Sequence, residues 1–374
     1  MRKRRILSSF VIIFVILLVA SPWLVRMIQR SFFAEDLTLY EEREASIPFS
    51  GNWAMFQGDM GVYLLRNSEI RFLHPQQEDE WAFGTETLAP IATANGEHVF
   101  MMESSPRYLF RINELGHMLY QQPTSRSVDQ MTSCIDSYLL LQHPLENRLM
   151  PFSILDPQGM VIGNILLTEG EVIGSTISGR HEKVLITILR PSGQTFESTL
   201  LTYDLQGVLQ SSQSFSEQII VDLSITADGG IILLTNENIA RYNLLGEQQW
   251  DQPIGLFYLQ SKSSDGSWVL AHRPEASPEL SETDGTNTVL THIEIGSGKI
   301  HSYAVTEEVT ALKVRDNRIL TVYRQGFSLY RQTGELLAER ALQGDPGQVF
   351  LLPEDRVAVQ RQGQVNFYRL QTGS

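Results

Sequence analysis

A short pattern of turns and apolar runs recurs along nearly the whole chain after residue 50. It is clearest in residues 227–250, ADGGIILLTNENIARYNLLGEQQW. There an Asp-Gly turn precedes an apolar run (231–234), a second run (239–244) follows an Asn-Glu-Asn turn, and Gly246 leads to a third run that ends at Trp250. Short apolar runs bounded by Gly, Asn and Asp are typical of strands. The pattern therefore predicts consecutive antiparallel strands joined by tight turns.

The turn that opens this unit occurs eight times, and a strand-like run follows each copy. Because Asp-Gly and Asn-Gly tolerate positive φ at both central positions, we expect type I′ hairpins. The opening turns are Gly58-Asp59, Asn95-Gly96, Ile135-Asp136, Gly179-Arg180, Asp228-Gly229, Asp265-Gly266, Asp316-Asn317 and Pro353-Glu354-Asp355. The runs that follow them are 62–65, 98–102, 138–142, 184–189, 231–234, 268–272, 319–323 and 357–360.

One strand precedes each opening turn and others follow it, so each unit holds four strands over roughly 35–50 residues. Beyond the N-terminal segment, almost no part of the chain shows the i, i+3, i+4 apolar spacing of a helix. Four-stranded units of this length are typical of β-propellers, in which each blade packs on the next. We predict an all-β, eight-bladed β-propeller with four-stranded blades. Seven blades is the alternative, if one irregular unit is an insertion.

The last unit lacks an outer strand, because only three runs (349–352, 357–360 and 365–370) precede Ser374. Residues 37–43, which precede the first inner strand, could supply the fourth strand. A sheet built from both ends of the propeller would remove an exposed edge and close the ring.

The N-terminal segment has the features of a membrane anchor. Arg2-Lys3-Arg4-Arg5 precedes residues 6–25, which carry no charge. Twenty residues at a rise of 1.5 Å span about 30 Å, the thickness of a bilayer's hydrocarbon core. The basic residues in front outweigh Arg26 and Arg30 behind, so the positive-inside rule places the N-terminus in the cytoplasm.

We therefore predict a single-pass cell-membrane protein with an extracytoplasmic propeller. Its parts are a cytoplasmic basic tail (1–5), a transmembrane signal-anchor helix (6–25), a stalk (26–36) and a propeller domain (37–374). The alternative is a cleaved signal peptide, although Leu18-Val19-Ala20 is a poor cleavage site.

Charge and cysteine content exclude several classes of function. The formal net charge is −14, and the first 30 residues hold six Lys/Arg and no acid, which leaves −20 on the rest. Because this strongly negative part of the chain repels the phosphate backbone of nucleic acids, we expect no nucleic-acid partner. Cys134 is the single cysteine, which excludes an internal disulfide and a Cys-based metal cluster. We expect a small buried residue on a strand there, with a reactive thiol as the alternative.

In residues 243–250, NLLGEQQW, a Gly stands four residues before a Trp. This arrangement resembles the repeat of quinoprotein-type (pyrroloquinoline-quinone-like) β-propellers, with weaker copies at Gly116…Tyr120 and Gly334…Ala338. The layout of residues 37–374 resembles that superfamily, including its non-enzymatic scaffold propellers of the bacterial envelope. The resemblance implies the fold and no activity. The adjacent cysteines of the quinone-dependent dehydrogenases are absent, so we expect no such cofactor.

No motif of a known chemistry stands out, and we expect no catalytic, cofactor-binding or metal-binding residues. HExxH, GxSxG and EF-hand patterns are missing, and Gly296-Ser-Gly298-Lys299 is better explained as a turn than as a phosphate loop. The eight histidines are scattered, with a cluster in the central channel as the alternative. The tryptophans that fit packing between blades better than a ligand cage are Trp53, Trp81, Trp250 and Trp268.

The connections between the second and third strands of the blades are long and varied. They share one face of a propeller with the blade-to-blade links, such as 123–129; we call it the long-loop face, and the opposite one, with the opening turns, the tight-turn face. Binding residues gather on loops held by a rigid scaffold. These connections are 103–107, 143–148, 190–197 and 272–287, the last of which could instead be a solvated insertion. The candidate binding residues are Arg107, Arg126, His143, Arg148, Arg190, Phe196, His272, Arg273, Glu275, Glu279 and Asp284.

The sequence favours a non-catalytic scaffold whose long-loop face binds a protein or an envelope component. One alternative is a propeller hydrolase or lyase acting on glycan or peptide, with acids and His143, His272 or Arg273 at the channel mouth. Another is a small-ligand sensor. If the N-terminal strand is the outer strand of the last blade, it starts on the tight-turn face, and the long loops point away from the membrane.

Overall fold

The computed structural model describes residues 37–47, 53–66, 69–76, 80–84, 90–103, 107–243, 245–263, 266–273, 288–361 and 363–372. The predicted tail, transmembrane helix and stalk lie outside this part of the chain. Within it, no helix combines the length and the apolar character that crossing a bilayer requires. The chain divides into residues 39–369 and a small unit of residues 1–38 and 370–374. Of the small unit, the structure describes the strand ends 37–38 and 370–372.

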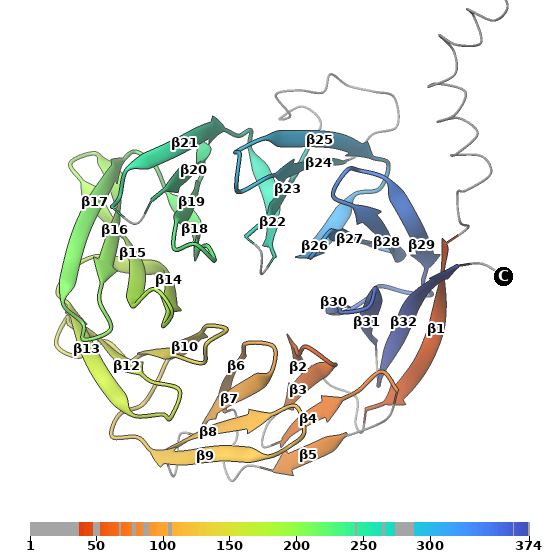
Figure 1. The fold of residues 1–374 in the computed structure, drawn as a ribbon, viewed down its shortest axis with the longest axis horizontal. Coiled ribbons are helices and arrows are strands. Elements are labelled where there is room, and N and C mark those ends of the chain that lie inside the picture. The colour runs from red at the N-terminus through yellow and green to blue at the C-terminus, as the bar shows by residue number, and fades with distance from the viewer. Residues whose placement is uncertain are drawn as a thin grey trace, which may run out of the picture. The chain divides into compact units, whose positions relative to one another are not determined.

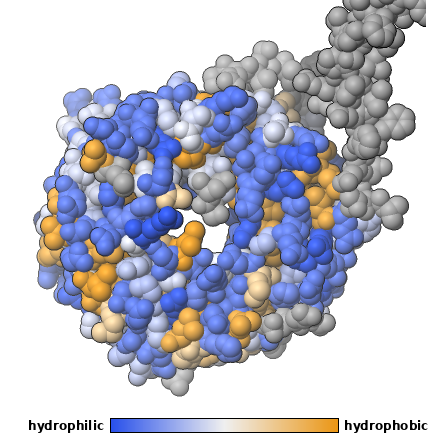
Figure 2. Space-filling view, in the orientation of Figure 1, coloured by the Kyte–Doolittle hydropathy of each residue, from blue (hydrophilic) through white to orange (hydrophobic). Residues whose placement is uncertain are grey.

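Residues 39–369 form eight four-stranded antiparallel sheets arranged as blades around a central opening (Figure 1). The predicted fold class and the count of eight blades are confirmed. Figure 2 shows the open centre of the ring and a mostly hydrophilic face with apolar patches. The innermost strand of each blade is the one that precedes its opening turn: β2, β6, β10, β14, β18, β22, β26 and β30 (Figure 1).

Seven blades are each built from four consecutive strands. Blades 1 and 2 contain β2 (Ala54–Gln57), β3 (Val62–Arg66), β4 (Glu69–Leu73) and β5 (Trp81–Gly84), then β6 (Ile91–Ala94), β7 (His98–Met102), β8 (Tyr108–Asn113) and β9 (Met118–Pro123). Blades 3 and 4 contain β10 (Gln130–Ser133), β11 (Leu139–Gln142), β12 (Met150–Leu155) and β13 (Val161–Leu167), then β14 (Glu171–Ser178), β15 (Lys183–Ser192), β16 (Thr195–Tyr203) and β17 (Leu209–Ser216). Blades 5 and 6 contain β18 (Ile220–Ile225), β19 (Ile231–Thr235), β20 (Asn238–Tyr242) and β21 (Gln248–Pro253), then β22 (Phe257–Lys262), β23 (Trp268–His272), β24 (Thr288–Ile293) and β25 (Ile300–Val305). Blade 7 contains β26 (Val309–Arg315), β27 (Arg318–Tyr323), β28 (Gly326–Arg331) and β29 (Leu336–Ala341).

The eighth blade is built from both ends of the propeller. Its order is β1 (Leu37–Ser46), β32 (Gln364–Thr372), β31 (Arg356–Arg361) and β30 (Val349–Leu352), which confirms the predicted closing sheet. The backbone N–H of Ile47 donates to the carbonyl of Gly363 at 2.8 Å. The Asn366 amide nitrogen donates to Glu41 Oε1 at 2.9 Å. This pairing covers the edge that the last blade would otherwise expose.

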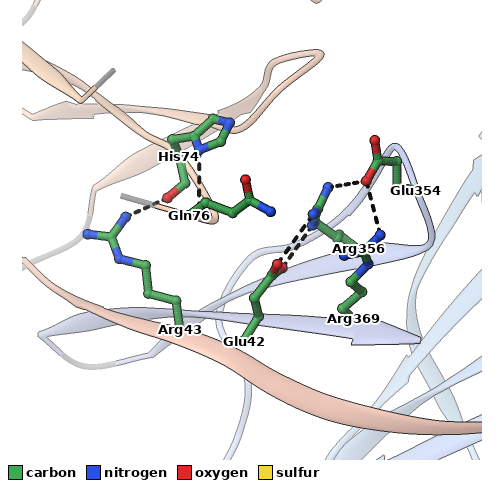
Figure 3. A network of polar contacts seen from close by, with 7 residues as sticks. All are labelled: Glu42, Arg43, His74, Gln76, Glu354, Arg356 and Arg369. Carbon is green, nitrogen blue, oxygen red and sulfur yellow. Dashed lines mark hydrogen bonds and ion pairs between the residues drawn. The ribbon is translucent and has the colours of Figure 1, made fainter. Parts of the chain in front are cut away.

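Hydrogen bonds and ion pairs of charged side chains hold β1 to the rest of blade 8 and to blade 1 (Figure 3). Within blade 8, Arg356 Nε donates to Glu42 Oε2 at 2.8 Å. Toward blade 1, Arg43 donates to the carbonyl of His74 and pairs with Glu80. Burial raises the pKa of Glu42, but the hydrogen bond and the charge of Arg356 outweigh burial and hold that pKa below its ordinary value. The ionised Glu42 therefore ties the first strand of the propeller to its last blade.

The opening turns are tight, but they do not all have the expected type I′ geometry. Both central residues are left-handed in the turn of the last blade, where Glu354 and Asp355 have φ values of 57° and 55°. The expectation is wrong for Asp228-Gly229. In the turn at residues 226–230, the N–H of Gly229 donates to the carbonyl of Thr226 at 2.8 Å. Gly229 has a φ of 85°, whereas Asp228 is not in the left-handed region. The turn thus needs one left-handed residue, as in a type I turn with a bulge, and Gly supplies it.

The outer turns of the blades repeat a motif in which Asp or Asn stands three residues before Gly. In blade 4, Asp204 Oδ1 accepts from the backbone N–H groups of Gln206 at 3.0 Å and Val208 at 2.8 Å. The N–H of Gly207 donates to the carbonyl of Asp204 at 3.1 Å. The side-chain oxygen therefore folds the turn, and Gly closes it.

Each seam, meaning the contact surface between two consecutive blades, buries apolar side chains from both. On several seams an aromatic side chain of an outer strand also lies against the outer-turn Gly of the next blade. A Cβ at Gly298 would come within 2.8 Å of the Trp250 ring, and one at Gly159 within 2.9 Å of the Tyr120 ring. Trp250 Nε1 donates to the carbonyl of Ile295 at 3.2 Å. The interpretation of Trp250 as a packing residue between blades is confirmed.

Candidate functional site

Three of the predicted binding residues, Arg107, Arg126 and His143, lie together at the blade 2–3 seam on the long-loop face. Arg107 and His143 hold the link between β9 and β10, and Arg148 follows His143 on the next hairpin of blade 3. Arg107 Nη1 donates to the carbonyl of Ser125 in this link at 3.0 Å, and His143 Nδ1 lies 2.7 Å from the carbonyl oxygen of Ser127. The link, which also carries Arg126, is therefore held from both neighbouring blades.

His143 is an internal anchor of this seam. Its side chain is 5% exposed. Because a carbonyl oxygen only accepts hydrogen bonds, the proton of the neutral ring is on Nδ1, facing Ser127. Nε2 therefore accepts a hydrogen bond from Ser153 Oγ at 2.9 Å. Because a hydroxyl has one proton, Ser153 gives up its alternative acceptor, Asn164 Oδ1 at 3.2 Å, when it donates to Nε2. Both ring nitrogens are thus used to hold the link on blade 3.

A two-residue hairpin displays the neighbouring side chains to solvent. The backbones of Glu146 and Leu149 exchange two hydrogen bonds, at 2.9 and 2.8 Å. Between them, Asn147 and Arg148 have φ values of 52° and 66°. This left-handed conformation is ordinary for Asn and uncommon for Arg. Arg148 is exposed, and Leu145 is 64% exposed.

The remaining predicted residues lie elsewhere on the ring. The prediction of an irregular loop at 190–197 is wrong, because β15 and β16 extend to a turn at 193–194 and form a regular hairpin. Arg190 there is engaged with Glu169 at 2.6 Å and with Glu197 at 3.1 Å, and Phe196 is half-buried. The cause is that residues 190–192 and 195–197 continue the strand ladder that begins in the core.

Blade 6 holds His272 and Arg273. His272 is 1% exposed, and its Nδ1 lies 3.1 Å from the carbonyl oxygen of Leu256 in the preceding link. Arg273 is exposed. His143 and His272 thus belong to different blades, and each binds a link carbonyl. The last three predicted residues, Glu275, Glu279 and Asp284, lie outside the described residues.

A second candidate, missed by the sequence interpretation, is a pocket of about 400 Å³ at the tight-turn mouth of the central channel. Its charges are largely paired, since Arg315 bonds to Asp59 at 3.0 Å and Lys262 to Asp222 at 2.7 Å. Nearby, burial raises the pKa of Glu114 to about 7, although the N–H of Met60 donates to its carboxylate at 2.8 Å. The pocket is lined by Gln57, Asp59, Ala94, Asn95, Gly96, Glu97, Ile135, Lys262, Val314 and Arg315. Inner strands of blades far apart in the sequence build it, which local patterns do not predict.

Cys134 follows β10 within the opening turn of blade 3 and is half-buried, so its predicted place on a strand is wrong. Burial and the neighbouring Asp136 raise the pKa of its thiol to about 12. Such a thiol is protonated at neutral pH and is a poor nucleophile. Across the described part of the chain, no group of three or more His, Cys, Asp or Glu side chains could hold a metal ion.

No family model matches the sequence, and no curated protein matches it. Solved propellers do match the fold. The chain is similar to BamB from Moraxella catarrhalis with 9% identity and a TM-score of 0.55, over 90% of this chain and 99% of that one. It is similar to the C-terminal WD40 domain of Sif2 with 11% identity and a TM-score of 0.57, over 89% and 99%. A structure of the eukaryotic initiation factor matches with 11% identity and a TM-score of 0.52, over 84% and 82%.

At these identities the similarity concerns the fold alone. The chain has a β-propeller fold like that of BamB and of the Sif2 WD40 domain.

Proposed function

We propose that this chain is a non-catalytic binding and scaffold module whose blade 2–3 seam, on the long-loop face, binds a protein or a cell-envelope component. The observation that carries the proposal is the hairpin at residues 146–149. It holds Arg148 in a backbone conformation that costs an L-residue other than Gly or Asn roughly 1–2 kcal/mol. Such strain is retained where the surrounding structure imposes it, and it is frequent at binding sites.

The exposed side chains of the seam indicate the chemistry of the partner. Arg126 and Arg148 form no ion pair with the described residues, and Leu145 is largely exposed between them in the sequence. Arg is enriched in the energetically dominant part of protein interfaces. On a chain of net charge −14, two free guanidinium groups on one seam favour a partner with acidic groups beside an apolar one.

The proposal includes a membrane anchor at residues 6–25, a cytoplasmic N-terminus and an extracytoplasmic propeller. The apolar run and the basic residues in front of it support this part. The direction of β1 agrees with it, since Ile47, after the C-terminal end of β1, bonds to Gly363 in the connection between β31 and β32 on the long-loop face. A tether that precedes β1 would then approach the propeller from the tight-turn side, with the blade 2–3 seam directed away.

The test fuses a proximity-labelling enzyme to the C-terminus of the full chain and supplies a membrane-impermeant substrate to intact cells of the native host. Arg126→Glu combined with Arg148→Glu should reduce labelling of the principal partner at least tenfold, because two charges turn from attraction to repulsion. Arg180→Glu, an exposed arginine on the tight-turn face, is the matched control and should label as the unmodified chain does.

The two parts of the proposal fail separately. Absence of any labelling from the impermeant substrate would contradict the extracytoplasmic location. Equal labelling by the double variant and the Arg180→Glu control would contradict the blade 2–3 seam as the binding site.

A further inference from the structure

The pocket at the tight-turn mouth of the central channel, here called the mouth pocket, is lined by charges of both signs. Its lining includes two cationic side chains, Lys262 and Arg315, and two acidic ones, Asp59 and Glu97, so these charges sum to zero. The cations stand at the ends of β22 and β26, whereas Glu97 follows β6 on the opposite side of the opening in Figure 1. The mouth pocket therefore extends from a basic side to an acidic side.

Lys262 and Arg315 lie next to each other on the basic side. The backbone N–H of Val314 in β26 donates to Ser261 Oγ in β22 at 3.2 Å, and the two cationic residues come next along these strands. Both strands end at the opening turns of their blades, on the tight-turn face. The two side chains therefore leave neighbouring strands at the same level of the channel.

Both cations keep N–H groups that have no hydrogen-bond acceptor among the described residues. Lys262 Nζ has three, of which two donate to Asp222 Oδ1 and to the carbonyl of Leu223, each at 2.7 Å. Arg315 has five, of which one donates to Asp59 Oδ1 at 3.0 Å. Solvent reaches both side chains, since Lys262 is 38% and Arg315 21% exposed. A carboxylate entering the pocket could therefore accept hydrogen bonds from both.

Glu97 provides the negative charge of the acidic side. Its side chain is 74% exposed, and its nearest basic group in the described part of the chain is His98 Nδ1 at 3.9 Å. Burial lowers the pKa of His98, so this ring is neutral at pH 7 and does not compensate the carboxylate. Burial, and to a smaller extent the charges of Asp59 and Glu97, raise the pKa of the neighbouring Glu114 to about 7. Glu97 is thus an accessible carboxylate without a counter-ion.

The mouth pocket is large enough for more than a single small group. An apolar cavity of about 150 Å³ in another protein holds one benzene molecule, and the mouth pocket has about 400 Å³. Its uncharged lining includes Ala94, Val314 and Ile135, and Ile135 is 75% exposed. Small aliphatic groups of a ligand would therefore find apolar contacts between the two charged sides.

We propose that the mouth pocket binds a short zwitterionic peptide with free amino and carboxyl ends. The carboxylate accepts hydrogen bonds from Lys262 and Arg315, and the ammonium group pairs with Glu97. Small apolar side chains of the peptide contact Ile135 and Val314. A zwitterion adds no net charge to a lining whose charges sum to zero, whereas an anion or a cation would meet a like charge without compensation.

The experiment titrates trialanine into the full chain and measures binding by calorimetry. N-acetyl-trialanine lacks the ammonium group, and trialanine amide lacks the carboxylate. Each blocked form should bind at least tenfold more weakly than trialanine, because it loses a charge-assisted contact with one side of the pocket. Free alanine should also bind more weakly, because its two charged groups are too close together to reach both sides.

Two variants assign the ends of the peptide to the sides of the pocket. Glu97→Gln should lose the preference for trialanine over the N-acetyl form and keep the preference over the amide. Arg315→Gln should lose the preference over the amide and keep the preference over the N-acetyl form. Glu182→Gln is the matched control for Glu97→Gln, because Glu182 is an exposed acid of another opening turn and does not line the pocket. It should bind all three probes as the unmodified chain does.

Several results would overturn the proposal. Equal affinities for trialanine and its blocked forms would show that the charged ends are not recognised. Equal changes in Glu97→Gln and Glu182→Gln would place the binding outside the mouth pocket. Alanine binding as tightly as trialanine would contradict a peptide ligand, and absence of saturable trialanine binding would mean that the pocket holds water only.

Discussion

The blade 2–3 seam and the blade 5–6 seam are built from the same parts. Each has an aromatic residue of an outer strand against the outer-turn Gly of the next blade, Tyr120 on Gly159 and Trp250 on Gly298. Each also has a histidine whose Nδ1 holds the link carbonyl. In one seam the second ring nitrogen is satisfied from within the chain, and in the other it is not. The same histidine anchor is thus fully hydrogen-bonded in the blade 2–3 seam and leaves one buried nitrogen without a partner in the blade 5–6 seam.

The largest expected effect tests whether the two seams share their aromatic packing. Gly159→Ala and Gly298→Ala should each lower the free energy of unfolding by about 3 kcal/mol, because a Cβ meets an aromatic ring and φ is positive at both sites. Gly246→Ala has a positive φ but nothing within 4 Å, so it should cost about 1 kcal/mol. Denaturant unfolding of the three variants measures this. Equal losses would show that the rings contribute nothing specific.

A smaller change in the free energy of unfolding tests how the two seams differ in the hydrogen bonds of their histidines. Replacement of His143 removes two hydrogen bonds, to Ser127 and Ser153, whereas replacement of His272 removes one, to Leu256. His143→Ala should therefore destabilise the chain by about 1 kcal/mol more than His272→Ala. Unfolding free energies of both variants under one set of conditions measure the difference. A difference of zero would mean that the Ser153 contact is not a stabilising hydrogen bond.

The smallest effect is a dependence on pH. Because the pKa of His272 is lowered in the folded chain, the unfolded chain binds more protons at this residue between its folded pKa and the unfolded value of about 6.5. Its contribution to stability is therefore complete above about pH 6.5 and is lost as the pH falls below that value. His272→Gln should remove this loss, so the stability difference between the unmodified chain and the variant should be constant above pH 6.5 and change below it. Parallel curves over the whole range would contradict a neutral buried ring.

Much of the fold follows from short-range patterns in the sequence. Each blade begins with turn residues that are followed by an apolar run. Turns and strands are determined largely by local conformation, so the eight blades could be counted from the sequence. The closing sheet could also be predicted, because the last unit is one strand short and residues 37–43 have no other place. Trp250 can also be predicted to pack between blades, because it stands four residues after Gly246 in the sequence. One outer turn and the start of one strand set this separation.

The site could be predicted in part. The order of strands and connections puts Arg107, Arg126, His143 and Arg148 on one face, and the structure brings the first three together at one seam. Their division into anchors and exposed groups depends on the link carbonyls of Ser125 and Ser127, whose position is a tertiary property. In blade 6 the Thr291 hydroxyl contacts Ser302 Oγ, and His272 Nε2 has no partner. Neither the composition of the sequence nor the spacing of its motifs predicts which of these hydrogen bonds form.

The closing sheet has a consequence for the order of events during synthesis. About 320 residues separate β1 from its partner β32. At the usual speed of translation, roughly 5–20 residues per second, β1 waits on the order of half a minute with its edge unpaired. An unpaired strand edge invites pairing with other chains, and charged residues discourage it. Glu41, Glu42, Arg43 and Glu44 are consecutive in β1, and their side chains form hydrogen bonds or ion pairs in the folded ring. Before the ring is complete, the same four charges would oppose pairing of β1 with other chains.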